Sequence, residues 1–184
     1  MKPLEFSLRP FQDGGFPSGP DVTGHISRQS NVLSIGYRII GPSAEFMAST
    51  PAEIPVRKNA LWEETCMELF LAPKNSSQYW EFNLCPSGHW NVYRFESYRS
   101  DMREETAFTA LPFIVRRWPD ELQLILEIDL NLINIPQQTL DVAVSAVIKR
   151  RDHATGYWAL SHTGRQPDFH RRDSFILEVD AESI

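Results

Sequence analysis

Three polar residues in the middle of the chain, Glu68, Glu81 and Asn83, carry groups that suit both ligand binding and acid–base chemistry. They lie in two short segments, 66–71 and 79–85, in which apolar side chains occupy alternate positions. Because successive side chains of a strand point to opposite faces, a core built from these apolar positions turns the three polar groups to the other face. We therefore expect two carboxylates and a carboxamide on one sheet surface.

A third segment, 89–98, would extend this surface with a cation. If Tyr93 and Phe95 point into the core, Arg94 shares the face of the carboxylates, and Trp62 arrives beside them from the preceding loop. A flat aromatic ring stacks on the C–H face of a pyranose, while planar Glu, Asn and Arg groups form paired hydrogen bonds with vicinal hydroxyls. The pattern is thus typical of a sugar site. The alternative is a set of cross-strand salt bridges on a solvated face, each worth about 0.5 kcal/mol.

Strand signals also dominate the rest of the chain. Alternating or apolar segments occur at 4–9, 22–29, 32–40, 113–118, 121–130, 140–148, 157–160 and 174–179. The proline-containing region 41–61 predicts a long loop with at most one short helical turn near Ala44–Met47. About ten strands, with no helix longer than two turns, predict an all-β fold. We expect a two-sheet antiparallel β-sandwich of the jelly-roll or immunoglobulin-like kind.

Length and composition indicate the class of protein. The 184 residues contain no repeat or dividing linker, and they predict a single domain over 1–184. A net charge of −6 argues against nucleic acid and anionic membranes as partners. The sequence contains no apolar stretch of about 18 residues, so we expect no membrane-spanning segment. The first residues do not read as a secretory signal, so we expect a cytoplasmic protein. Cys66 and Cys85 are too few for a disulfide scaffold; they are interpreted as buried reduced thiols, with a cross-strand disulfide as the alternative.

Two central motifs resemble those of carbohydrate-binding modules of family 9 and the related DOMON-like domains. Residues 61–71 read LWEETCMELFL, and residues 79–88 read YWEFNLCPSG. In those families a Trp precedes a strand similar to D-x-V-E-x-F, and the next strand is similar to Y-x-E-F-x-x-x-P-x-G. The later runs 157–162 (YWALSH) and 167–175 (PDFHRRDSF) look like the closing segment of bacterial stand-alone DOMON-like proteins. The similarity covers roughly residues 20–180.

This resemblance implies a β-sandwich with a sugar or haem site. In the sugar-binding modules two tryptophans sandwich the terminal sugar, and a Glu and an Arg hold its hydroxyls. By motif position, Trp62 and Trp158 correspond to the first and second of these tryptophans, Glu68 corresponds to the Glu and Arg94 to the Arg. With Glu81 and Asn83 in support, we expect non-catalytic binding of a small carbohydrate or sugar-containing ligand without a cofactor. Because the family is usually attached to secreted glycosidases, a chain without an export signal favours a small glycan over a polysaccharide.

Other functions also fit parts of the sequence. Glu68 and Glu81 could form the acid/base pair of a glycosidase-like hydrolase, and a pure interaction sandwich would need no pocket on this face. A DOMON-type haem would need an axial His and Met, for which the candidates are His25, His89, His162, His170, Met47 and Met67. The cluster His162, Asp168, His170 and Asp173 could converge on a metal, but it is interpreted as a charged turn. A structural calcium ion is known in related modules, but no dense Asp/Asn-Gly loop identifies its ligands here.

Overall fold

The computed structural model describes residues 2–11, 19–41 and 49–181 of the chain. Its twelve strands are β1 (Leu4–Pro10), β2 (Asp21–Gln29), β3 (Val32–Ile40), β4 (Cys66–Pro73), β5 (Tyr79–Leu84), β6 (Trp90–Phe95), β7 (Arg103–Glu104), β8 (Phe113–Trp118), β9 (Glu121–Asp129), β10 (Leu140–Lys149), β11 (Thr155–Ala159) and β12 (Leu177–Val179). The helices of this part of the chain are the short 3-10 turns η1 (Leu61–Glu63), η2 (Leu130–Ile133) and η3 (Arg172–Ser174), and none of them could cross a membrane. The predicted all-β class is therefore confirmed. The helical turn expected near Ala44–Met47 lies outside the described residues.

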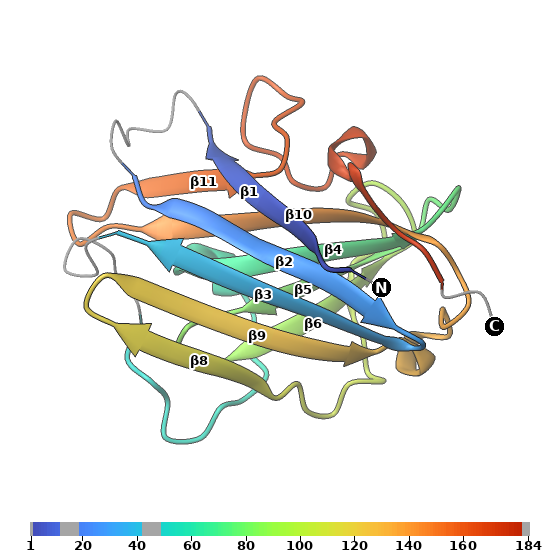
Figure 1. Cartoon of the computed structure of the whole chain (residues 1–184), viewed down its shortest axis with the longest axis horizontal. Helices are drawn as coiled ribbons and strands as arrows, with labels where there is room; N and C mark the ends of the chain where they lie inside the picture. Colours follow the sequence, from blue (N-terminus) through green and yellow to red (C-terminus); the bar gives the residue numbers. More distant parts are fainter. Residues whose placement is uncertain (1, 12–18, 42–48, 182–184) are drawn as a thin grey trace.

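All named strands pair antiparallel, in the order β7-β6-β5-β4-β10-β11-β1-β2-β3-β9-β8, with β12 also on β10. Strand β1 pairs with β2 along most of its length and with β11 at its end, through Arg9–Ala159 and Pro10–Trp158. In Figure 1, β1, β2, β3, β9 and β8 lie in front of β11, β10, β4, β5 and β6. The expected pair of separate sheets is thus replaced by one continuous, curled sheet, because β1 joins both halves.

One large apolar core lies between the two halves. The front half contributes residues such as Ile26 and Ile35, and the back half contributes Met67, Leu69 and Phe82, all of them completely buried. Each such side chain stabilises the fold by about 1.5–3 kcal/mol through its removal from water. The apolar positions that alternate along β4 and β5 therefore face inward, as predicted from the sequence.

The outward face of β4 and β5 is also covered, so every residue of these two strands is buried. Phe70, Tyr79, Phe95 and Phe175 form a second, smaller apolar cluster there, against which Phe169 packs. Phe169 and Phe175 belong to the segment that precedes β12, so this segment covers part of the outward face. Polar groups on the outward face, which the sequence predicts to be solvated or ligand-exposed, therefore lie in an enclosed environment.

Candidate functional site

A cavity of about 350 Å³ lies on the outward face of the β4–β5 half of the sheet. Its polar lining consists of Glu68, Glu81, Arg99 and His170. Its aromatic lining consists of Trp62, Phe95, Tyr157 and Phe169, and Met102, Val147 and Pro167 complete the wall. The cavity thus combines charged groups and aromatic rings from segments spread over more than half of the sequence.

Strand register places the two carboxyl groups of the cavity. Glu68 on β4 lies opposite Asn83 on β5 and opposite Ser145 on β10, while Glu81 lies two residues before Asn83 on the same face. The Ser145 hydroxyl donates a 3.0 Å hydrogen bond to Oε2 of Glu68, and the Asn83 amide donates a 2.8 Å hydrogen bond to Oε1 of Glu81. Both glutamates are only 3% exposed. Their orientations are therefore fixed by neighbouring strands before any ligand arrives.

Burial changes the acidity of both groups. Loss of water and, to a lesser extent, the nearby Glu81 carboxylate raise the pKa of Glu68 to about 8, against the Ser145 hydrogen bond and the Arg99 charge. Loss of water also raises the pKa of Glu81 to about 7, opposed by the Asn83 hydrogen bond and by Arg99. Because like charges in one buried site cannot ionise independently, the two groups titrate as a pair. The pair therefore retains proton occupancy near neutral pH.

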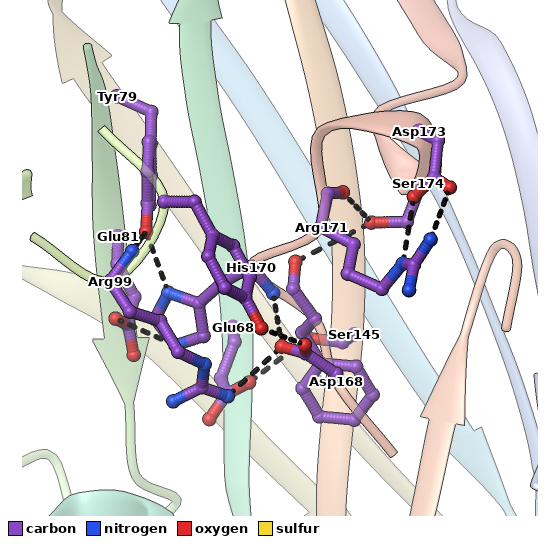
Figure 2. Close-up of polar contacts among 12 residues, drawn as sticks. Glu68, Tyr79, Glu81, Arg99, Ser145, Asp168, His170, Arg171, Asp173 and Ser174 are labelled. Atoms are coloured by element: carbon purple, nitrogen blue, oxygen red, sulfur yellow. Dashed lines mark hydrogen bonds and ion pairs between the residues drawn. The ribbon is translucent and has the colours of Figure 1, made fainter. Parts of the chain in front are cut away.

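A hydrogen-bonded chain leads from Arg99 through Tyr79 to His170, whose ring lies beside Glu81, as Figure 2 shows. The backbone N–H of Arg99 donates to the Tyr79 hydroxyl oxygen at 3.2 Å, and this hydroxyl lies 2.9 Å from Nδ1 of His170. Burial lowers the pKa of His170 to about 4, so its ring is neutral near pH 7. Nε2 of the ring lies 3.8 Å from Oε2 of Glu81. In the tautomer in which Tyr79 donates to Nδ1, the ring proton resides on Nε2 and His170 presents a donor to the cavity.

Asp168 holds the segment that carries His170 against the loop after β6. It accepts a 2.6 Å hydrogen bond from the Tyr98 hydroxyl and a 3.0 Å hydrogen bond from Nη2 of Arg99. Burial opposes ionisation of Asp168, but these bonds outweigh it and lower its pKa. The charge of Arg99 is consequently paired with Asp168 rather than with either carboxyl group on the cavity floor.

Trp62 comes from η1 and is 38% exposed, which leaves much of its ring open to a ligand. The ring packs against Tyr93 at a centroid distance of 5.8 Å. Three of the residues predicted for the site, Trp62, Glu68 and Glu81, therefore line one cavity, and Asn83 lies behind Glu81 as its hydrogen-bond donor.

The structure corrects the expected positions of Arg94 and Trp158. Arg94 pairs with the core residue Trp80, so the side chains of β6 alternate in the opposite phase to the predicted one. The Arg94 guanidinium lies outside the cavity and donates a 2.6 Å hydrogen bond to Glu96. Trp158 pairs with Ala146, faces the core and is 1% exposed. Neither residue can contact a ligand in the cavity in this arrangement. Phe95, Tyr157, Arg99, Phe169 and His170 line it instead, and sequence reasoning did not assign them to the sugar site.

The residues considered as metal or haem ligands or as a disulfide pair make different contacts in the structure. Among the described residues no three His, Cys, Asp or Glu side chains converge; His162 bonds the carbonyl of Arg9, and Asp173 bonds Arg171 and Thr163. Met67 is completely buried in the core, and Met47 lies outside the described residues. Cys66 and Cys85 are buried free thiols.

Comparison with known proteins connects the fold to sugar-binding structures. No family model matches the sequence, and no curated protein matches it either. A candidate carbohydrate-binding protein from Bacteroides uniformis superposes with a TM-score of 0.68 over 93% of this chain and 83% of that one, at 14% identity. A family 9 carbohydrate-binding module from Caldicellulosiruptor kristjanssonii, solved with glucose and with cellotriose, gives TM-scores of 0.55 at 11% identity. These alignments cover 90% and 96% of this chain and 78% and 83% of the modules, and such likeness establishes a shared fold.

Proposed function

We propose that this chain is a non-catalytic carbohydrate-binding domain whose ligand occupies the cavity between Trp62 and the Glu68–Glu81 pair, and that it is related to family 9 modules and DOMON-like domains. One observation carries the proposal: a half-exposed aromatic ring and two preoriented carboxyl groups line the same cavity. The likeness to modules solved with glucose and cellotriose supports it.

The size and lining of the cavity suit a small sugar. Its volume of about 350 Å³ falls in the range of about 300–1,000 Å³ that is typical of small-molecule sites. Trp62 offers a face for the sugar ring, while Glu68, Glu81 and the Nε2–H of His170 offer acceptors and a donor for hydroxyls. Because Ser145, Asn83 and Tyr79 already orient these groups, little conformational freedom is lost on binding.

A glycosidase-like hydrolase is the second candidate, because both carboxyl groups line one cavity and have raised pKa values. A raised pKa suits a general acid. A retaining or inverting pair, however, needs environments that separate the two pKa values and leave one carboxylate ionised. Here burial raises both, which favours binding over catalysis.

Calorimetric titration with glucose and cellotriose, preceded by a glycan array, tests the proposal. We expect Trp62→Ala to weaken binding of the array-positive sugar at least about tenfold, which is about 1.4 kcal/mol, while the melting temperature changes little. Trp118→Ala is the matched control, because Trp118 is 47% exposed on β8 in the other half of the sheet. Absence of any sugar binding, or equal binding by both variants, would contradict the proposal. Hydrolysis of a chromogenic glycoside that is lost in Glu68→Gln would instead support the hydrolase.

A further inference from the structure

The floor of the cavity holds two carboxyl groups that have no close cation of their own among the described residues. Glu68 and Glu81 are contributed by β4 and β5, and the charged or titratable groups that face them are Arg99, Asp168 and His170, with Tyr79, Tyr93 and Cys66 around the pair. The Arg99 guanidinium is paired with Asp168 at 3.0 Å. The His170 ring is neutral near pH 7 because burial lowers its pKa to about 4. Arg99 therefore favours the ionised forms of the two carboxyl groups only from a distance, and His170 adds no positive charge near pH 7.

Each carboxyl group also has an open acceptor atom. Ser145 occupies Oε2 of Glu68, and Asn83 occupies Oε1 of Glu81. Within the described part of the chain, nothing donates a hydrogen bond to the other oxygen of Glu68. Oε2 of Glu81 has Nε2 of His170 at 3.8 Å, which is longer than a hydrogen bond. Neither oxygen is counted among the buried polar atoms without a partner, so both open into the cavity, where water or the donors of a ligand can reach them.

We propose that the sugar bound here carries a free, protonated amino group, as a hexosamine does, and that its ammonium lies between Glu68 and Glu81. This inference rests on the proposed function and narrows it to a class of ligand. An ammonium has three donors and no acceptor, which matches the open oxygens, and hydrogen bonds between charged partners are about twice as strong as neutral ones. Trp62, Phe95 and Phe169 line the same cavity and add aromatic faces that attract a cation.

Binding of an ammonium must also displace protons. The two carboxyl groups share proton occupancy near neutral pH because they are buried together, and a cation between them favours the ionised forms. A hexosamine should therefore release protons as it binds. A neutral sugar of the same size leaves the carboxyl groups protonated to the same extent and should release almost none.

Calorimetry on the full chain at pH 7, in two buffers of different ionisation enthalpy, measures both quantities. Glucosamine, glucose and N-acetylglucosamine serve as probes that differ in charge at one position. We expect glucosamine to bind at least about tenfold more tightly than the two neutral sugars and to release protons. Glu68→Gln and Glu81→Gln should each reduce this preference to a few-fold or less. Glu127→Gln, at an exposed position of β9, is the matched control and should retain it.

The outcomes separate this inference from the proposed function. Equal affinity for glucosamine and glucose without proton release would overturn the inference that the ligand carries an amino group, and it would leave the proposed sugar binding intact. Tighter binding of N-acetylglucosamine would also overturn it. Binding of cyclohexylamine as strongly as glucosamine, with no response to glucose, would overturn both. Should either glutamine variant fail to fold, the comparison of the three sugars and their proton release on the unchanged chain still decides.

Discussion

The Tyr79 hydroxyl and Nδ1 of His170 share a 2.9 Å hydrogen bond, although the two residues are 91 positions apart in the sequence. The same imidazole packs edge-on against Phe70 and Phe95, at centroid distances of 5.3 and 5.1 Å. These contacts fix the segment that carries Phe169 and His170 over the outward face of β5. The cavity wall therefore depends on a long-range contact between a strand and a loop.

Tyr79→Phe should destabilise the protein without displacing the ring. Tyr79 stacks on Phe95 at 4.7 Å, and phenylalanine preserves this contact, but Nδ1 of His170 loses its donor in a buried site. We expect the free energy of unfolding in urea to fall by about 1–3 kcal/mol, the cost of an unsatisfied buried acceptor. Tyr157→Phe is the control for stability, because Tyr157 is only partly buried and its hydroxyl forms no hydrogen bond within the described part of the chain. Equal stability of wild type and Tyr79→Phe would show that this hydrogen bond is unimportant.

The buried carboxyl pair should make stability depend on pH in a defined window. The folded pKa values of Glu68 and Glu81 are raised from 4.5 to about 8 and about 7, so above pH 4.5 the unfolded chain releases protons that the folded chain still holds. Their contribution to stability therefore falls as pH rises through this range. His170 acts in the opposite direction, because its folded pKa is lowered from 6.5 to about 4 and its contribution rises between these values. Above pH 6.5 more than half of the unfolded-state His170 is already neutral, so the glutamate effect is the larger of the two.

Thermal unfolding between pH 6.5 and 8 tests this effect in the range where it is the larger one. We expect the free energy of unfolding to decrease as pH rises, by at most about 1.4 kcal/mol per pH unit for each proton released. Glu68→Gln should flatten the profile, because glutamine cannot ionise, whereas Glu127→Gln should leave the slope unchanged. A wild-type profile that rises or stays flat over this range would contradict the raised pKa values.

Sequence alternation was sufficient to place residues on β4 and β5 but not on β6. Met67 and Leu69 alternate with Glu68, so the polar side of β4 could be read directly. On β6, apolar or aromatic residues occupy both faces, with Trp90 and Val92 on one and Tyr93 and Phe95 on the other, and all four are buried. Polarity then carries no information on phase, and Arg94 was assigned to the wrong face.

The rest of the cavity depends on tertiary contacts that no local pattern encodes. Phe169 and His170 lie in a segment without strand periodicity, and their position follows from docking against Tyr79 and Phe70. Trp158 follows Tyr157 directly, and which of these two aromatic residues faces the cavity depends on the register of β11 with β10. The continuous, curled sheet likewise depends on the second pairing of β1, which involves only two residues at its end.

The guanidinium of Arg57 makes several of the contacts that hold the loop preceding Trp62. It stacks over the Trp90 ring at 4.4 Å, and Nη1 donates to Oδ1 of Asn91 at 2.6 Å. Nη2 donates to the carbonyl oxygens of Glu105 and Phe108, at 3.0 and 2.5 Å. Arg57 therefore connects this loop to β6 and to the segment after β7. It lies five residues before Trp62, the aromatic residue predicted to stack on the sugar.

Arg57→Lys should consequently destabilise the fold and weaken ligand binding together. Lysine retains the charge, but its compact ammonium cannot stack on Trp90 and reach three acceptors in one plane. We expect a loss of about 2–3 kcal/mol in the free energy of unfolding in urea, which corresponds to one or two hydrogen bonds of a charged group. Arg38→Lys is the matched control, because Arg38 forms an exposed ion pair with Glu121 and such pairs contribute little. If Arg57→Lys is as stable as Arg38→Lys, then the loop is held by its backbone hydrogen bonds, such as the one from Lys58 to the carbonyl of Trp90, and the position of Trp62 does not depend on Arg57.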